Sequence, residues 1–206
     1  MRARSKPAGM IVGAALAAMA LIAMTNSADA CACCTNLGQR RVSVEKLDQA
    51  KLTQIEMIRF DKTAFLFVGE GDAGNVKGIV QPSLRYDLTA TQKDGGFIFA
   101  LRDAAGRTGT LTLARPSTVS VFEIDPRETD EEGGLGPTLY KEWKLTARAA
   151  GSGAFAPGAG AGQQITLALQ GRGNNCTSSA DFTHWTLIVH GKATEYHLFG
   201  KLEQTR

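Results

Sequence analysis

The sequence predicts an all-β protein: a mainly antiparallel β-sandwich or partly closed barrel of about nine to ten strands, with one short N-terminal helix. Runs of strand length recur along the chain, and several alternate apolar with polar residues. In residues 139–147, for example, the odd-numbered positions are mostly apolar and the even-numbered ones mostly polar. No long helical pattern separates the runs. Parallel strands need helical crossovers, so the strands are expected to be antiparallel.

The first thirty of the 206 residues have the pattern of a cleaved signal peptide. Arg2, Arg4 and Lys6 precede an uncharged run over residues 10–24, and the small residues Ala28 and Ala30 match a signal-peptidase site. The apolar run is shorter than the roughly 20 residues that cross a bilayer, so no transmembrane span is expected in the mature chain. We therefore expect an exported protein, periplasmic or extracellular, that begins at Cys31.

Lipid anchoring at Cys31 is a minor alternative. A lipoprotein signal would carry Leu three places before that cysteine, where this chain has Ala28.

Removing residues 1–30 takes three basic residues and one acidic residue from totals of 23 Lys+Arg and 20 Asp+Glu, which leaves a net charge of +1. Because the basic residues are also scattered, we expect no nucleic-acid partner.

Helical periodicity is confined to residues 45–60. Leu47, Lys51 and Ile55 are spaced by four, Ile58 follows three later, and Asp48 is a suitable N-cap. The mature chain is then divided into a cysteine-rich arm with this helix (31–62) and a β domain (63–206), which together form a single domain.

Nine segments beyond the helix have strand length, and most are bounded by Gly, Pro or Asp. They are residues 64–68, 84–88, 97–101, 110–113, 119–124, 139–147, 165–169, 182–189 and 195–202, with 76–80 as a weaker tenth.

Two connections stand out by their glycine content. Residues 149–162 are rich in Gly and Ala and predict a flexible loop, in which Phe155 could anchor a lid. Residues 69–74 match G-x-G-x-x-G. A dinucleotide site needs a helix to begin within those glycines, but Gly78 and Pro82 interrupt the next stretch of chain, so a glycine-rich hairpin turn is expected instead.

Four cysteines remain in the mature chain: Cys31, Cys33, Cys34 and Cys176. In an oxidising compartment we expect disulfides, most simply from Cys33 or Cys34 to Cys176. A second bridge within Cys-Ala-Cys-Cys would fit disulfide geometry poorly. The alternative is a soft-metal site that binds copper or zinc through these four cysteines.

The histidines cluster near the C-terminus. If residues 191–194 form a two-residue turn, His190 faces Glu195 and Ile188 faces His197. His190, Glu195 and His197 then share one face of the hairpin, as a secondary candidate for a metal or other binding site.

These patterns predict an exported, non-catalytic β-rich binding or structural module whose ligand is an unidentified small molecule or metal ion. The alternative is a periplasmic Cu(I)- or Zn(II)-binding protein that uses the N-terminal cysteines. The third possibility is an enzyme with an unrecognised site, since the chain lacks the G-x-S-x-G, H-E-x-x-H and G-K-[ST] motifs.

Overall fold

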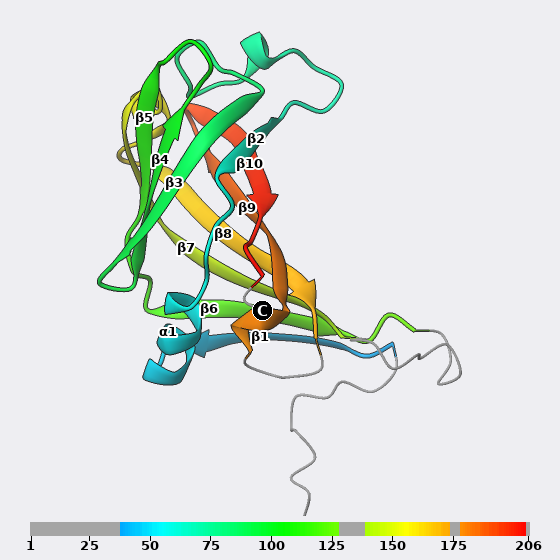
Figure 1. Cartoon of the computed structure of the whole chain (residues 1–206). Coiled ribbons are helices and arrows are strands. Elements are labelled where there is room, and N and C mark those ends of the chain that lie inside the picture. The colour runs from blue at the N-terminus through cyan, green and yellow to red at the C-terminus, as the bar shows by residue number, and fades with distance from the viewer. Residues whose placement is uncertain (1–37, 128–138, 174–177, 205–206) are drawn as a thin grey trace, which may run out of the picture. The chain divides into compact units, whose positions relative to one another are not determined.

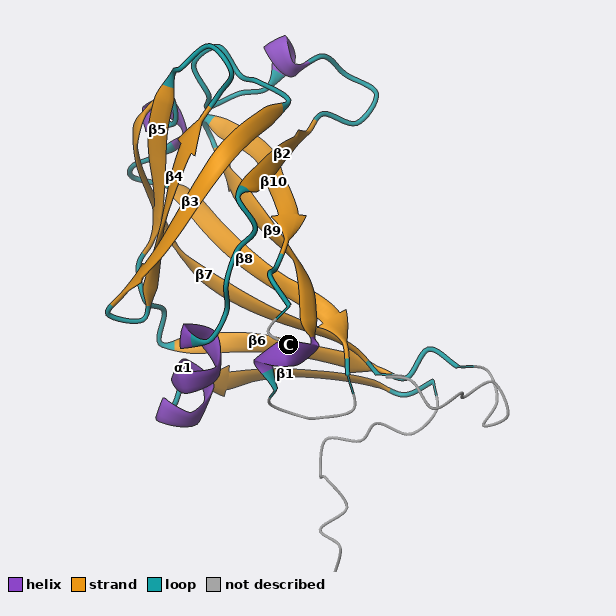
Figure 2. Ribbon diagram, viewed as in Figure 1, coloured by secondary structure: helices purple, strands orange, loops and turns teal. Residues whose placement is uncertain are grey.

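The computed structural model describes residues 38–127, 139–173 and 178–204. Within these ranges the chain forms ten strands, one α-helix and short 3-10 helices (Figure 2). In chain order the elements are β1 (Arg40–Lys46), α1 (Gln49–Glu56), β2 (Thr63–Phe67), η1 (Ala73–Asn75), β3 (Arg85–Lys93), β4 (Gly96–Arg102), β5 (Thr108–Leu113), β6 (Thr118–Ile124), β7 (Tyr140–Gly153), η3 (Ala156–Gly158), β8 (Gln163–Arg172), η4 (Ser179–Asp181), β9 (Phe182–Gly191) and β10 (Thr194–Lys201).

Eight strands close into an antiparallel barrel. Their order is β7-β5-β4-β3-β2-β10-β9-β8, and β8 pairs back onto β7 (Figure 1). The closing ladder runs from Tyr140 opposite Arg172 to Arg148 opposite Gln164. Of the two expected architectures, the barrel is therefore the correct one, and the β-sandwich is not.

The long strand β7 joins the barrel to a sheet extension. Its first residues pair with β6, whereas residues 149–153 pair with β5. β6 pairs in turn with β1, which ends the sheet. One strand thus belongs to both the barrel wall and the extension.

The barrel interior is filled by side chains, as eight strands allow. Alternate residues of most barrel strands point inward, and the buried aromatic rings Phe97, Phe99 and Trp185 stack on one another in the core. Phe60 meets all three rings edge-on at centroid distances of 5.4–5.7 Å.

The helix α1 lies at the lower end of the barrel in Figure 1. Asp48 caps it by accepting a hydrogen bond from the Lys51 amide, as expected, and Leu52 and Ile55 are buried in the same core as the barrel strands. The helix is shorter than the expected 45–60. Residues 45 and 46 pair with β6, and the backbone N–H of Met57 bonds to Gln54, which ends the helix in a tighter turn.

The upper end of the barrel is closed by the segment around η3. Residues 149–153, which we expected to lie in a flexible loop, continue β7, and Phe155 is fully buried between Tyr86 and Tyr196. The glycines and alanines permit close contact there. A Cβ added to Gly153 would overlap the Thr108 carbonyl, so only glycine fits at this position. Gly153 also has a positive φ, which glycine adopts without strain.

All nine principal strand predictions are confirmed, but the weaker tenth is wrong and one strand was missed. β1 was not predicted, and residues 76–80 form an isolated bridge at Lys77 rather than a strand. Among the described residues, no helix has both the length and the hydropathy needed for a membrane span.

Candidate functional site

A pocket of about 350 Å³ opens in the barrel wall between β2 and β10. It arises because β2 leaves the sheet. Phe67 is the last residue of β2 to pair with β10, and it lies opposite His197. The chain returns to β10 at Lys77, which forms an isolated bridge with Glu195. The register leaves Tyr196 between these two pairs. The pocket is lined by Phe67, Val68, Gly69, Gly71, Asp72, Asn75, Val76, Lys77, Glu195, Tyr196 and His197.

The loop that borders the pocket is braced by its own hydrogen bonds. The Gly71 amide donates to the Val68 carbonyl at 2.9 Å, and the Asp72 carboxylate accepts from the Gly74 amide at 3.1 Å. Val76, like Val68, packs against the barrel core. These contacts hold the loop in a defined path beside β10.

This loop contains the G-x-G-x-x-G match. The helix that begins there is a 3-10 turn of three residues, Ala73–Asn75, and it is not the α-helix of a dinucleotide site. It is also longer than the glycine-rich hairpin turn we expected, since 17 residues separate the end of β2 at Phe67 from the start of β3 at Arg85. The glycines therefore shape the rim of a pocket.

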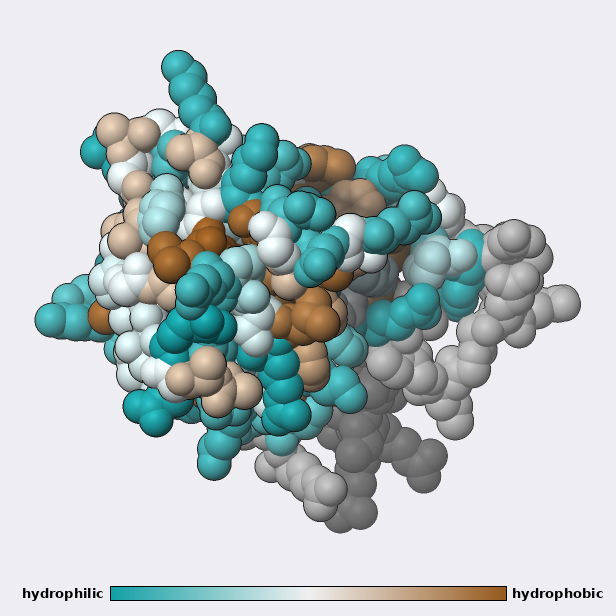
Figure 3. Space-filling model, turned by 90° about the horizontal axis from the view of Figure 1, so that it is seen from above, coloured by the Kyte–Doolittle hydropathy of each residue, from teal (hydrophilic) through white to brown (hydrophobic). Residues whose placement is uncertain are grey.

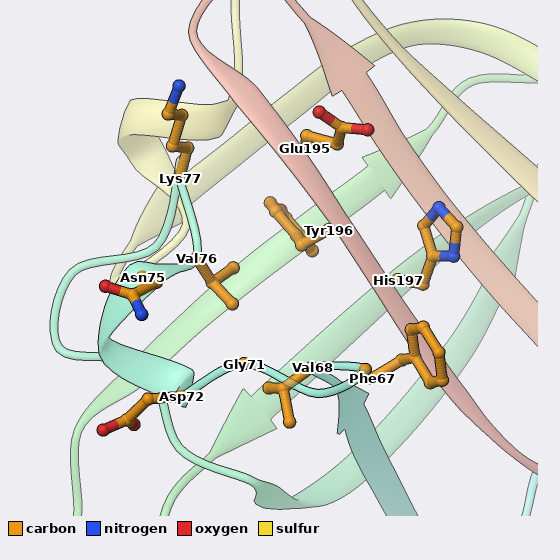
Figure 4. Close-up of a pocket in the computed structure, with 11 residues that line it drawn as sticks. Phe67, Val68, Gly71, Asp72, Asn75, Val76, Lys77, Glu195, Tyr196 and His197 are labelled. Atoms are coloured by element: carbon orange, nitrogen blue, oxygen red, sulfur yellow. The ribbon is translucent and has the colours of Figure 1, made fainter.

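Charged and polar side chains surround the opening from both sides. Figure 4 shows Asp72, Asn75 and Lys77 along the loop and Glu195 on β10, with Tyr196 between them. Asp72, Asn75, Lys77 and Glu195 are all exposed. One ammonium and two carboxylates thus lie around a small opening.

Tyr196 is the buried polar group of the pocket. It is 3% exposed, and its phenolic O–H has no hydrogen-bond partner among the described residues. Burial raises the pKa of this phenol, so it remains a neutral donor at physiological pH. A buried hydroxyl without a partner costs roughly 1–3 kcal/mol.

Aromatic rings lie along the lower rim, on the outer face of β2 and β10. Phe67 stacks beside His197 with a centroid distance of 6.3 Å, and Phe65 lies 5.8 Å from Phe199. Phe67 is 59% exposed. Seen from above, hydrophobic residues appear as several separate patches among hydrophilic ones (Figure 3). These rings could provide local contacts for a planar or apolar part of a ligand.

The expected register of the histidine hairpin is found: His190 lies opposite Glu195 and Ile188 opposite His197. The two histidines nevertheless line different hollows. His197 lines the pocket at Tyr196, whereas His190 borders an open hollow near Arg148. Among the described residues, no group of three or more His, Cys, Asp or Glu is placed to hold a metal ion.

The cysteine predictions fall elsewhere in the chain. Cys31, Cys33, Cys34 and Cys176 lie outside the described residues, so their disulfides and their metal binding remain predictions.

A row of charged residues, of which Glu123 and Lys141 are buried, crosses the sheet extension and was not expected. Arg41 lies opposite Glu123, and Glu123 opposite Lys141. Lys141 is fully buried, and its ammonium donates to the Asp181 carboxylate at 2.8 Å. The alternation of apolar and polar residues along β7 could have indicated this row. Lys141 occupies a position that alternation predicts to be buried, and its neighbours on that face are apolar.

Burial raises the pKa of the Glu123 carboxyl, although the cations Arg41 and Lys141 oppose the shift. The Asp181 carboxylate lies directly against Gly173, where a Cβ would overlap it. The row is densely packed, and its charges face one another. It resembles a structural ion-pair array rather than an opening for a ligand.

The comparisons with known proteins found no match among family models, curated proteins or solved structures.

Proposed function

We propose that this protein is an exported binding module whose ligand site is the wall pocket at Tyr196. The observation that carries the proposal is a pocket of about 350 Å³ in the barrel wall that is lined by the buried Tyr196, whose hydroxyl has no hydrogen-bond partner among the described residues. That volume lies in the range of small-molecule sites, which combine apolar walls with a few polar groups that fix orientation.

The lining residues indicate the ligand chemistry. Val68 and Val76 give apolar walls, and Tyr196 adds a buried O–H group without a hydrogen-bond partner among the described residues. Lys77 and Glu195 offer opposite charges at the rim. We infer a small, polar molecule with a hydrogen-bond acceptor that reaches Tyr196 and a planar part that contacts Phe67 or His197.

A thermal-shift screen with small aromatic and heterocyclic carboxylates, amides and amines tests this proposal, followed by calorimetry on the compounds that raise the melting temperature. Tyr196→Phe keeps the ring but loses the donor, so affinity should fall about 2- to 12-fold. His197→Ala should also weaken binding, whereas the matched variant His190→Ala, outside the pocket, should not. The proposal fails if no compound stabilises the protein, or if bound compounds are insensitive to both pocket variants.

Export and the disulfide are proposals that rest on the sequence. A bridge from Cys33 or Cys34 to Cys176 is supported by the distance between the described residues nearest to these cysteines, which the intervening chain is long enough to span. Arg40 and Arg172 lie in one row across β1, β6, β7 and β8, three strand spacings or about 14 Å apart. Cys34 lies six residues before Arg40 and Cys176 four after Arg172, and extended chain covers about 3.3 Å per residue.

Intact mass of the protein isolated from its exporting host, with and without alkylation, tests these proposals together. We expect loss of residues 1–30 and cysteines that resist alkylation until reduced. Four free thiols would contradict the disulfide. Stoichiometric copper or zinc that is lost in Cys33→Ser and Cys34→Ser would favour the metal-binding alternative.

A further inference from the structure

β1 ends the ten-stranded sheet, and among the described strands it pairs with β6 alone. Figure 1 shows it as the outermost strand of the extension, next to β6. Its seven residues contain no Pro or Gly. The outward N–H and C=O groups of such an edge form a template for pairing with another strand.

The apolar residues of this edge are exposed. Val42 is 70% and Val44 is 72% exposed, more than any other large hydrophobic residue in the described chain. Both lie on the outer face of β1, beside Phe122 and Ser120 of β6. A second strand laid along the edge would cover them.

We propose that this protein forms a two-fold symmetric homodimer by antiparallel pairing of β1 with β1 of a second copy, centred on Ser43. The sequence of β1, Arg-Arg-Val-Ser-Val-Glu-Lys, is self-complementary in that register. On one face, Val42 of each copy lies opposite Val44 of the other. On the other face, Arg41 lies opposite Glu45 of the second copy.

The charges at Arg41 and Glu45 favour this register. Directly opposed ions and apolar residues stabilise an antiparallel pair, and each interaction occurs twice because of the two-fold axis. Within one copy, Arg41 already lies 3.5 Å from Glu45 and 3.5 Å from Glu123. These are long contacts, and a guanidinium has five N–H donors, so donors remain for a second carboxylate.

The two ends of the edge oppose the pairing. In the same register, the exposed Arg40 lies opposite the exposed Lys46 of the second copy, and like charges directly opposite are destabilising. A single strand pair is also a small interface. We therefore expect a dimer that dissociates on dilution.

Sedimentation velocity over a concentration series of the native-length protein tests the proposal. Val42→Lys should weaken the dimer by at least about tenfold, since it sets a charge against Val44 of the second copy. The matched control is Val80→Lys, a change at another exposed valine that lies outside β1, which should leave dimerisation unchanged. Circular dichroism confirms that each variant is folded.

Two further variants examine the register. Lys46→Glu replaces the opposed like charges by attractive pairs, and it should tighten the dimer by about 3- to 10-fold. Ser43→Cys sets two thiols opposite each other at the axis, so mild oxidation should give a disulfide-linked dimer that the wild type does not give. Val44→Cys, which lies opposite Val42, should give less.

A protein that is monomeric at every concentration would overturn the proposal and leave the edge to an extended segment of another protein. A dimer that is indifferent to Val42→Lys and Lys46→Glu would equally overturn it, because the interface would then lie elsewhere. Neither result bears on the pocket at Tyr196, whose test measures ligand binding.

Discussion

Lys141 is a fully buried cation, and the fold accommodates it by pairing it with Asp181. Removing one member of a buried ion pair leaves the other charge uncompensated, which is costly. We expect Lys141→Met to lower the free energy of unfolding by about 3–5 kcal/mol, measured by urea denaturation.

The matched control is Lys144→Met on the same strand. Lys144 also pairs with a carboxylate, that of Glu142 at 2.6 Å, but its side chain is 43% exposed. Exposed pairs contribute little, so this change should cost less than about 1 kcal/mol. Equal losses in the two variants would mean that burial of the pair at Lys141 has no energetic consequence.

Glu123 predicts a pH dependence of stability. Because burial raises the pKa of its carboxyl, the folded protein binds that proton more tightly than the unfolded chain does. The resulting stabilisation is complete below the ordinary carboxyl pKa and is lost as pH rises through the raised value. Glu123→Gln cannot ionise, so it should be more stable than the wild type at neutral pH. Denaturation at a series of pH values should show this advantage shrinking toward about pH 4, and an advantage that is constant with pH would contradict the assignment.

At the scale of elements, the segment around η3 closes the barrel by means of one side chain. Phe155 is fully buried, 5.5 Å from the Tyr86 ring and 6.2 Å from the Tyr196 ring by centroid distance. We expect Phe155→Ala to cost about 3–5 kcal/mol, visible as a lower melting temperature. Phe67→Ala, at a phenylalanine that is 59% exposed, should change stability far less. Similar losses would show that η3 does not seal the core.

Period-two alternation was sufficient to locate nine strands, and Asp48 is the N-cap that the sequence suggested, although the helical pattern was expected to begin at residue 45. Alternation could not reveal β1, because both its valines and its charges are partly exposed and the strand buries no apolar face. The helical period continued beyond α1 because Leu47 and Ile58 are also buried, although neither belongs to the helix.

The candidate site was partly within reach of the sequence. The period of two along β10 places Glu195 and His197 on the same face, and the turn at residues 191–194 sets His190 opposite Glu195. The rest of the pocket depends on where β2 stops pairing and where Lys77 returns to β10. That return is a contact between residues far apart in the chain, so local patterns contain no signal for it.

At the scale of the whole molecule, the protection of backbone amides from hydrogen exchange should depend on the position of each strand in the sheet. β8 and β9 lie within the closed barrel and pair along both edges, whereas β1 pairs along one. We expect the amide hydrogens of β8 to exchange slowest and those of β1 fastest among the strands, measured by hydrogen–deuterium exchange at low protein concentration. Equal protection in β1 and β8 would indicate that the extension does not open separately from the barrel.

The excursion of the chain between Phe67 and Lys77 separates the proposed binding surface from the barrel scaffold. The intervening residues contribute no pair to the β2–β10 ladder, so substitutions or insertions at 69–75 can alter the contour of the rim while the eight-stranded scaffold is retained. Related chains could thus diverge in what they capture through this short stretch, and a library randomised there is a direct route to barrels with new binding preferences.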